Sequence, residues 1–424
     1  MSSEPTEAFV WVWLPGAEQP VVAGRIGLAH RIVRFNYGRS YLGRPDAIPL
    51  YLPELPLRAG LIEPLGGLTM PGCIKDAGPD AWGQRVVMHH LLGAGAKDGD
   101  PAVFGPITYL LHSGSDRIGA LDFQAASDAY HSRDEASAPL EDLMQAADLV
   151  NENLPLPPAL DLALLHGSSV GGARPKALLK DGGRDLIAKF SSSTDTYAIV
   201  KGEFAAMELA RRAGLDVAGV QLVRVMGRDV MLVERFDRVP GTKQRRALVS
   251  ALTMLELDEM MARYASYADL AQIVRERFTD ARRTLRELFA RITFNILTGN
   301  SDDHARNHAA FWDGRWLTLT PAYDICPQPR GGGETSQAMM IGGDGYRMSQ
   351  LAGCVARATT YMLTASDARE LIDHQIDVIA REWNEVCDRA KMTSVERSFF
   401  WRRQFLNPYP FEGYAGTHLI GSWP

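Results

Sequence analysis

The stretch of residues 299–327, GNSDDHARNHAAFWDGRWLTLTPAYDICP, constrains this chain more than any other part because its acidic and amide side chains have the spacing of a phosphotransferase. Asp302 and Asn307 stand in a D-x-x-x-x-N pattern, which is the interval of the protein-kinase catalytic loop. In that loop the aspartate is the base and the asparagine holds a metal ion. The HRD triplet that usually accompanies the loop is absent here.

A β-hairpin is predicted directly after this pattern. Residues 309–312 and 316–320 are mostly apolar and flank the turn pair Asp313-Gly314. Since a hairpin folds the chain back, we expect Asp324 to return close to Asn307, so that both can bind one magnesium ion. The alternative is ordinary turn chemistry, because Asp and Asn are common in loops and at helix starts.

The nucleotide-binding half is predicted upstream, in residues 167–190. A Gly- and Ser-rich loop precedes two short apolar strands, and backbone amides beside Gly171 and Gly172 can approach phosphates closely. The Gly-Lys-Ser/Thr ending of a Walker A loop is missing. Lys189 lies within the second strand, and Glu203, on a helix predicted over 202–213, is its candidate partner. A surface lysine and a first-turn glutamate are the alternatives.

A further apolar strand is predicted over residues 230–236, VMLVERF. Its end, Glu234 to Phe236, is a candidate adenine-binding hinge. The pattern alone does not distinguish a hinge from any buried strand.

With these motifs in order, the chain resembles the HipA-like serine/threonine kinases, which are toxins of bacterial toxin–antitoxin pairs. The segments that carry the resemblance are SSVGGARPKALL (168–179), the strand around Lys189, VERFDR (233–238), GNSDDHARN (299–307) and LTPAYDICP (319–327). The resemblance implies an α+β, two-lobed fold related to protein and phosphoinositide kinases. It also implies transfer of the γ-phosphate of ATP to protein serine, with ATP and Mg2+ as cofactors.

The resemblance also implies roles for individual residues. Asp302 would be the catalytic base, Asn307 and Asp324 the magnesium ligands, and Ser169 the serine at which this family can phosphorylate itself. Phosphate on Ser169 would expel the loop and abolish ATP binding. The candidate nucleotide-binding residues are Val170, Gly171, Gly172, Ala173, Arg174, Lys176, Lys189, Glu234, Arg235, Phe236 and His304.

Asp303 and His304 directly follow the candidate base in the sequence. Asp303 places a second carboxylate next to Asp302 where relatives often have Gly or Arg, and adjacent like charges should raise the pKa of one of them. Asp302 is assigned as the base because only it keeps the spacing to Asn307. His304 has three possible roles, as a nucleotide contact, a proton carrier or a structural histidine, and the turn context favours the structural one.

Composition is that of an ordinary globular protein. The chain has 424 residues, of which 46% are hydrophobic and 23% charged, and no run approaches a membrane span. Its beginning lacks a basic and apolar signal, so we expect a cytoplasmic protein. The four cysteines lack C-x-x-C spacing and the histidines show no H-E-x-x-H pattern, so no disulfide frame and no metal beyond magnesium is expected.

A formal net charge of −6 disfavours strong direct binding to nucleic acid. DNA contact is therefore expected mainly through a partner. The resemblance implies that this partner is a small HipB-like helix-turn-helix antitoxin that represses its own operon.

Three parts are predicted along the chain: an N-terminal, β-rich subdomain over 8–123, a nucleotide-binding lobe over 141–238 and a mainly helical catalytic lobe over 239–424. The predicted function is a HipA-type protein kinase that phosphorylates a cellular protein; an aminoacyl-tRNA synthetase is a candidate because relatives can inactivate one. A small-molecule phosphotransferase and a non-catalytic module that binds a repressor partner are the alternatives.

Overall fold

A computed structural model describes residues 4–93, 100–133, 138–170, 172, 174–192, 195–330 and 333–415. The chain is an α+β protein that folds into two compact units. The first comprises Met1–Ser192, Val223–Val249 and Phe311–Arg315, and the second comprises Ser193–Leu222, Ser250–Ala310 and Trp316–Pro424. The three-part division expected from the sequence has other boundaries and stays a prediction.

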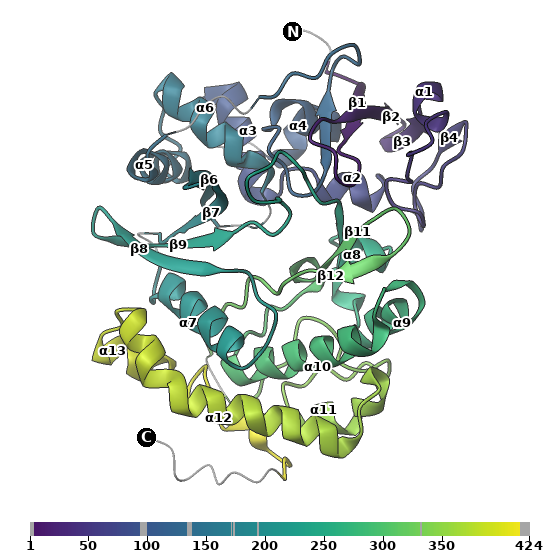
Figure 1. Cartoon of the computed structure of the whole chain (residues 1–424). Coiled ribbons are helices and arrows are strands. Elements are labelled where there is room, and N and C mark those ends of the chain that lie inside the picture. Colours follow the sequence, from purple (N-terminus) through teal and green to yellow (C-terminus); the bar gives the residue numbers. More distant parts are fainter. Residues whose placement is uncertain are drawn as a thin grey trace. The chain divides into compact units, whose positions relative to one another are not determined.

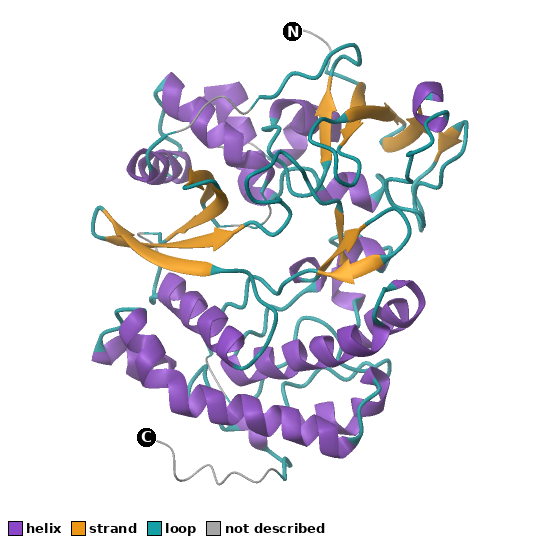
Figure 2. Ribbon diagram, viewed as in Figure 1, coloured by secondary structure: helices purple, strands orange, loops and turns teal. Residues whose placement is uncertain are grey.

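The first unit begins with a five-stranded sheet of order β4-β3-β2-β1-β5, whose described pairs are antiparallel (Figures 1 and 2). Alternate residues of β3 are buried, as expected for a strand with one face on a core. The N-terminal part of the chain is rich in β-strands, as the sequence predicts. Its strands are β1 (Glu7–Val12), β2 (Val21–Ala29), β3 (Ile32–Tyr37), β4 (Leu61–Ile62) and β5 (Leu121–Gln124).

Short helices follow and connect these strands, and two longer ones precede the Gly-rich loop. Pro157 and Pro158 start α6, because proline fits the first turn, where no backbone N–H partner is needed. The helices of this unit are α1 (Arg39–Leu42), α2 (Gly72–Asp76), α3 (Ala81–Leu92), η2 (Pro101–Val103), α4 (Pro106–His112), α5 (Leu140–Asn151), α6 (Pro158–His166) and η3 (Gly167–Ser169).

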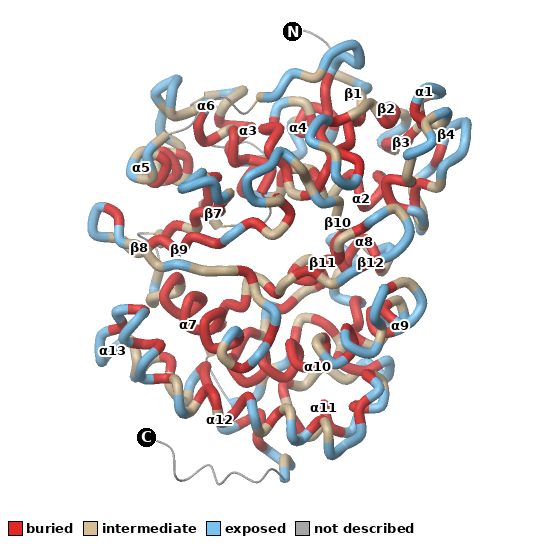
Figure 3. Tube along the Cα trace, in the orientation of Figure 1, coloured by how far each residue is buried: buried red, intermediate tan, exposed pale blue. Residues whose placement is uncertain are grey.

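A four-stranded sheet has the order β6-β7-β9-β8; β6, β7 and β9 belong to the first unit, whereas the first three residues of β8 are counted in the second. Its strands are β6 (Lys176–Asp181), β7 (Arg184–Phe190), β8 (Val220–Val225) and β9 (Arg228–Glu234). Helices α3, α5 and α6 pack their apolar side chains on one face of it, in a core that includes Trp82, Leu164 and Phe190. Figure 3 shows that these helices and strands contain buried stretches of the chain. Because side chains alternate along a strand, the residues between these core positions lie on the opposite face.

The second unit is mainly helical (Figure 2). Its helices are α7 (Ile199–Arg212), α8 (Ala251–Met254), η4 (Ala262–Tyr264), α9 (Tyr267–Arg277), α10 (Ala281–Thr298), η5 (Ala305–Asn307), α11 (Leu351–Ala356), η6 (Ala358–Tyr361), α12 (Ala365–Arg389), α13 (Ser394–Phe400) and η7 (Tyr409–Phe411). The last sheet has the order β10-β11-β12, with β10 (Leu248–Ser250), β11 (Ala309–Trp312) and β12 (Leu317–Leu319). The strands predicted around Asp313-Gly314 are therefore neighbours in one sheet.

Helix α10 leads into residues 299–327, which contain the D-x-x-x-x-N pattern. Asp280 caps its start by accepting a hydrogen bond from the backbone N–H of Arg283, and Gly299 ends it with a left-handed φ of 72°. Along its length Leu285, Leu288 and Ile292 are buried at helical spacing, as expected. None of the helices in the described residues has the length and apolarity needed to cross a membrane.

Candidate active site

The candidate catalytic turn, defined as residues 301–308, follows the glycine that ends α10. A Cβ at Gly299 would lie 2.9 Å from the carbonyl oxygen of Gln404, so the positive φ and the close packing both require glycine. The turn then continues into η5, in which Asn307 donates its backbone N–H to the carbonyl oxygen of His304 at 2.9 Å. The end of the helix therefore fixes where the turn begins.

Asp303 is fully engaged inside the second unit. Its carboxylate accepts hydrogen bonds from Nδ2 of Asn295 at 2.7 Å, from Nε2 of His308 at 2.9 Å and from the hydroxyl of Tyr267. Burial alone would raise the pKa of Asp303, but His308 and Tyr267 hold it below its ordinary value. A buried carboxylate whose Oδ2 already has three hydrogen-bond donors is a structural group.

Asp302, the adjacent residue, has the opposite environment. It is exposed, and its carboxylate has no hydrogen bond within the described part of the chain. Partial desolvation raises the pKa of Asp302; His304 acts against this rise, and Asp324 and Asp303 add to it. The expectation that one of two adjacent carboxylates has a raised pKa thus agrees with the structure. A carboxylate that is accessible and more basic than usual can accept a proton from a hydroxyl.

One ring nitrogen of His304 lacks the hydrogen bond that a structural histidine would make. Its Nδ1 is buried and has no hydrogen-bond partner among the described residues. A buried polar atom without a partner is costly, and a bound ligand can supply the missing contact. This observation favours the nucleotide-contact role of His304 over the structural one.

The residues that directly precede Asn307 and Asp324 are in contact with each other. The hydroxyl of Tyr323 donates to the carbonyl oxygen of Arg306 at 2.7 Å, so the residues just before the two candidate ligands are hydrogen-bonded. Asp324 has a positive φ of 60°, which is uncommon for a residue other than glycine and is often found at functional sites. Amide and carboxylate oxygens at one place are the donor set that magnesium prefers.

The loop of the first unit that carries Ser168 and Ser169 is packed against small residues. A Cβ at Gly83 would lie 1.8 Å from the carbonyl oxygen of Ser168, so only glycine allows α3 to approach the loop. Ser169 is buried, and its hydroxyl donates to the carbonyl oxygen of Gly114 at 2.9 Å. Val170 is buried as well, whereas Gly171 and Ala173 lie outside the described residues.

Two lysines share one face of the four-stranded sheet. Lys176 on β6 stands directly opposite Lys189 on β7, and directly opposite residues of antiparallel strands point to the same side. That side is opposite to the apolar core, because Ala177 and Ala188 belong to the core. Lys176 is buried, with its Nζ 3.8 Å from Oδ2 of Asp80. Two like charges opposite each other repel, so this face favours an anion.

Gly172 has a positive φ of 115° and lies next to the side chain of Lys176. A Cβ there would be 2.1 Å from Nζ of Lys176, so the glycine leaves the space that the ammonium group fills. Arg174, the remaining basic residue of this loop, is partly buried. Lys176, Lys189 and Arg174 thus bring three basic side chains to this part of the first unit, and basic side chains suit phosphates.

The side chain of Arg235 does not have the accessibility expected of a nucleotide contact. It is buried and forms ion pairs with Asp116 at 2.9 Å and with Asp237 at 2.8 Å. Burial would raise the pKa of Asp237, but Arg235 and Arg238 lower it to about 2. The guanidinium is therefore part of a buried ionic network, and any hinge contact here has to use the backbone.

The backbone of this segment has a geometry that suits such a contact. Arg235 donates its N–H to the carbonyl oxygen of Asp185 on the β7 side at 2.9 Å. Because hydrogen-bonding direction alternates along an antiparallel strand, the backbone groups of Glu234, the last residue of β9, point away from β7. The side chain of Glu234 is exposed, and the ring of Phe236 contacts that of Phe311.

Glu203, the candidate partner of Lys189, is buried on α7 in the second unit. Its pairing with that lysine stays a prediction. The neighbouring basic residue of the helix, Lys201, is engaged within its own unit, where it forms an ion pair with Glu396 at 3.0 Å.

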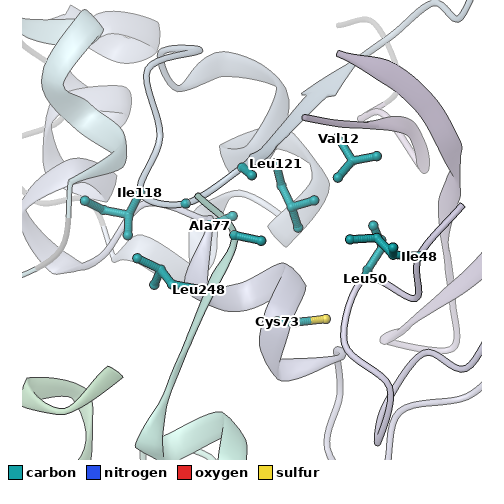
Figure 4. A pocket seen from close by; sticks show the side chains of 11 residues that line it. Val12, Ile48, Leu50, Cys73, Ala77, Ile118, Leu121 and Leu248 are labelled. Carbon is teal, nitrogen blue, oxygen red and sulfur yellow. The ribbon is translucent and has the colours of Figure 1, made fainter. Parts of the chain in front are cut away.

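Other sites have little support in the described residues. The described residues contain no group of three or more His, Cys, Asp or Glu side chains that could hold a metal ion. Asn307 and Asp324, one amide and one carboxylate, are not a group of this kind. An apolar cavity of about 20 Å³ in the first unit is lined by Val12, Leu50, Cys73 and Leu121 among others (Figure 4). It has room for about one water molecule, so it is too small for a nucleotide.

Four residues around the catalytic turn were missed by the sequence reasoning. Tyr267, Asn295 and His308 hold Asp303, and Nδ2 of Asn300 donates to Oδ1 of Asn295 at 3.0 Å. Asn295 and Asn300 lie five residues apart at the end of a helix, which is a signal for local hydrogen bonding. Nothing in the pattern around Tyr267 indicates its contact with a residue 36 positions away.

Comparison with known protein families gives a match over residues 168–383, just over half of the chain, to the model of the HipA-like C-terminal domain. The serine/threonine-protein kinase toxin HipA of Shewanella oneidensis is 27% identical over 183 residues, 37% of this chain and 42% of that protein. The putative kinase Y4mE of Sinorhizobium fredii is 26% identical over 328 residues, 70% of this chain and 72% of that protein. The match therefore spans less than half of the Shewanella toxin.

Among solved structures, a chain of the Shewanella oneidensis complex of HipA, HipB and operator DNA is similar, with a TM-score of 0.67 at 19% identity. The likeness covers 94% of this chain and 99% of that one. At this level of identity the comparison shows the fold.

Proposed function

This chain belongs to the HipA-like family, and on that premise we propose that it is a protein serine/threonine kinase that uses ATP and Mg2+. The observation that carries the proposal is the contrast between two adjacent carboxylates. Asp303 is occupied by three donors, whereas Asp302 is exposed, with a raised pKa and no hydrogen bond in the described residues. One acid shapes the turn, and the other is available for chemistry.

Asp302 accepts the proton of the attacking serine or threonine hydroxyl, and it orients that hydroxyl toward the phosphorus. The family relation supports this role, since the D-x-x-x-x-N spacing to Asn307 lies within the matched residues. Asn307 and Asp324 hold magnesium, which neutralises charge on the nucleotide phosphates. The hydrogen bond between Tyr323 and Arg306 keeps these two ligands near each other.

Lys176, Lys189 and the backbone from Val170 to Lys176 hold the phosphates of ATP. The two lysines on one sheet face and the glycine above them support this assignment. Nδ1 of His304 gains a hydrogen-bond partner when the nucleotide is bound. The backbone of the segment from Glu234 to Phe236, in which Glu234 faces away from β7, contacts the adenine.

Ser169 is the proposed site of autophosphorylation. Because it is buried and donates to Gly114, the loop has to leave this position before the hydroxyl can react. A phosphate at Ser169 would have no space against the Gly114 carbonyl, so it would keep the loop away and lower ATP affinity.

A HipB-like antitoxin is the proposed partner, and DNA contact occurs mainly through it. The similar solved structure contains HipA, HipB and operator DNA, which supports this assignment, as does the net charge of −6. The proposed substrate is a cellular protein, with an aminoacyl-tRNA synthetase as a candidate.

The decisive experiment incubates the purified protein and its Asp302→Asn variant with labelled ATP and magnesium, and locates phosphate by mass spectrometry. We expect label at Ser169 in the wild type alone. A Lys189→Met variant should bind ATP weakly and stay unlabelled. If wild-type protein binds ATP but neither labels itself nor a protein in a bacterial lysate, the proposal is wrong.

A further inference from the structure

The loop between α8 and α9 exposes a group of large apolar side chains in the second unit. Relative exposures are 81% for Met260, 45% for Met261 and 50% for Tyr264. We call these three residues the methionine patch. The other large apolar side chains exposed in the described part of this unit, Trp316, Met362 and Val395, stand singly along the chain.

The loop that carries the methionine patch is attached at both ends to the candidate catalytic turn. Before the patch, Glu259 forms an ion pair with Arg306 of the turn. After it, the hydroxyl of Tyr267 donates to the carboxylate of Asp303. The loop that carries the patch is therefore held on both sides of the patch by residues of the same short turn.

Further contacts hold the loop between these anchors. Met261 donates its backbone N–H to Oδ1 of Asp258 at 2.8 Å, and Arg347 donates to the carbonyl oxygen of Arg263 at 3.1 Å. The backbone of Ala265 and Tyr267 is also hydrogen-bonded to that of Met340. The side chains of the patch are thus presented to solvent by a backbone that is fixed.

Single apolar side chains on a surface are ordinary, but a group rimmed by charged residues marks an interaction site. Here Glu259 and Arg263 are exposed beside the patch, and the Arg263 guanidinium lies 4.9 Å from the centre of the Tyr264 ring. Methionine adapts to partners of different shape, and tyrosine adds a hydroxyl to an apolar ring.

From this geometry we propose that the methionine patch docks the protein substrate, by binding a large apolar side chain that lies close in sequence to the phosphoacceptor. This inference rests on the proposed kinase function. The occupant is the substrate, because the loop is anchored on the turn that carries Asp302. Arg306 is four residues from Asp302, so the Cα atoms of these two residues lie within about 14 Å of each other. About four or five extended residues cover that distance.

The test compares wild-type protein, Asp302→Asn, a Met260→Ser/Met261→Ser double variant and a Tyr264→Ala variant. Each is incubated with ATP and a dephosphorylated bacterial lysate, and phosphosites are quantified by mass spectrometry. Val395→Ser and Met226→Ser, whose residues are 77% and 70% exposed, serve as matched controls.

We expect sites labelled by wild type and not by Asp302→Asn to carry a large apolar residue within about five positions of the phosphoserine or phosphothreonine. Their labelling should fall at least tenfold in the double variant and in Tyr264→Ala. ATP affinity and labelling of Ser169 should stay within twofold of wild type, and the two controls should match wild type.

Three results would overturn the docking proposal while leaving the kinase function intact. In the first, the double variant labels the same sites at the wild-type rate. In the second, it loses Ser169 labelling as well, which would show that the loop acts on the catalytic turn. In the third, it keeps substrate labelling but loses self-association in light scattering, which would make the patch a contact between copies of this chain. Absence of any wild-type labelling above Asp302→Asn would instead reject the proposed function itself.

Discussion

Nε2 of His308 donates a hydrogen bond to the carboxylate of Asp303 at 2.9 Å, and this contact separates two acids that are adjacent in sequence. This hydrogen bond joins Asp303 to the residue before β11, and the hydrogen bond from Asn295 joins Asp303 to α10. Asp302, one residue earlier, has no hydrogen bond of this kind within the described chain.

The first prediction concerns these two carboxylates. Asp303→Asn removes the charge that three buried donors surround, so it should destabilise the protein by about 3–5 kcal/mol. Asp302→Asn should change stability by less than about 0.5 kcal/mol, because it alters an exposed side chain, yet it should abolish phosphoryl transfer. Denaturant unfolding and autophosphorylation, measured on both variants, check this. Equal destabilisation would contradict the assignment of roles.

The second prediction concerns pH. As a base, Asp302 works in its deprotonated form, so activity should rise with pH through a midpoint above that of an ordinary aspartate, since its pKa is raised. His304 lowers the pKa of Asp302. His304→Gln should therefore move the acid limb of the pH–rate profile to higher pH. Autophosphorylation rates of both proteins across pH give the answer, and a shift to lower pH would be inconsistent with the geometry.

The third prediction concerns the phosphate loop. Gly172→Ala places a Cβ in the space of Nζ of Lys176 and strains a φ of 115°. ATP affinity should fall about tenfold, which corresponds to about 1.4 kcal/mol. Gly182→Ala is the control, because Gly182 also has a positive φ but no atom within 4 Å of the added Cβ. Calorimetric titration with ATP should find wild-type affinity in the control; equal losses would point to strain alone.

The fourth prediction separates structure from binding at the candidate hinge. Arg235→Met removes one of the two buried arginines that pair with Asp116 and Asp237 and leaves only Arg238 with both carboxylates, so stability should fall by about 3–5 kcal/mol. Glu234→Gln breaks an exposed ion pair with Arg184 and should leave stability almost unchanged, because solvent screens such a pair. If the backbone alone contacts adenine, the folded fraction of Arg235→Met should bind ATP within about threefold of wild type. A larger loss of affinity would mean that the Arg235 side chain takes part.

The sequence by itself determined the elements whose signals are local. The buried positions of α10 follow helical spacing, Gly299 ends that helix, and Asp313-Gly314 joins two strands, because each depends on residues that are neighbours in the chain. The same is true of the Lys189 strand and of the order of the kinase motifs, which were enough to identify the family.

Only the tertiary structure decided what the neighbouring side chains do. The sequence presented Asp302 and Asp303 as two similar acids, and Arg235 as a candidate nucleotide contact. Their environments come from residues far along the chain: Tyr267 for Asp303, and Asp116 for Arg235. Hydrogen bonds and ion pairs across such separations leave no periodic pattern, so burial and partner choice appear only once the chain is folded. For the same reason, the attachment of the methionine patch to the catalytic turn could be found only in the structure.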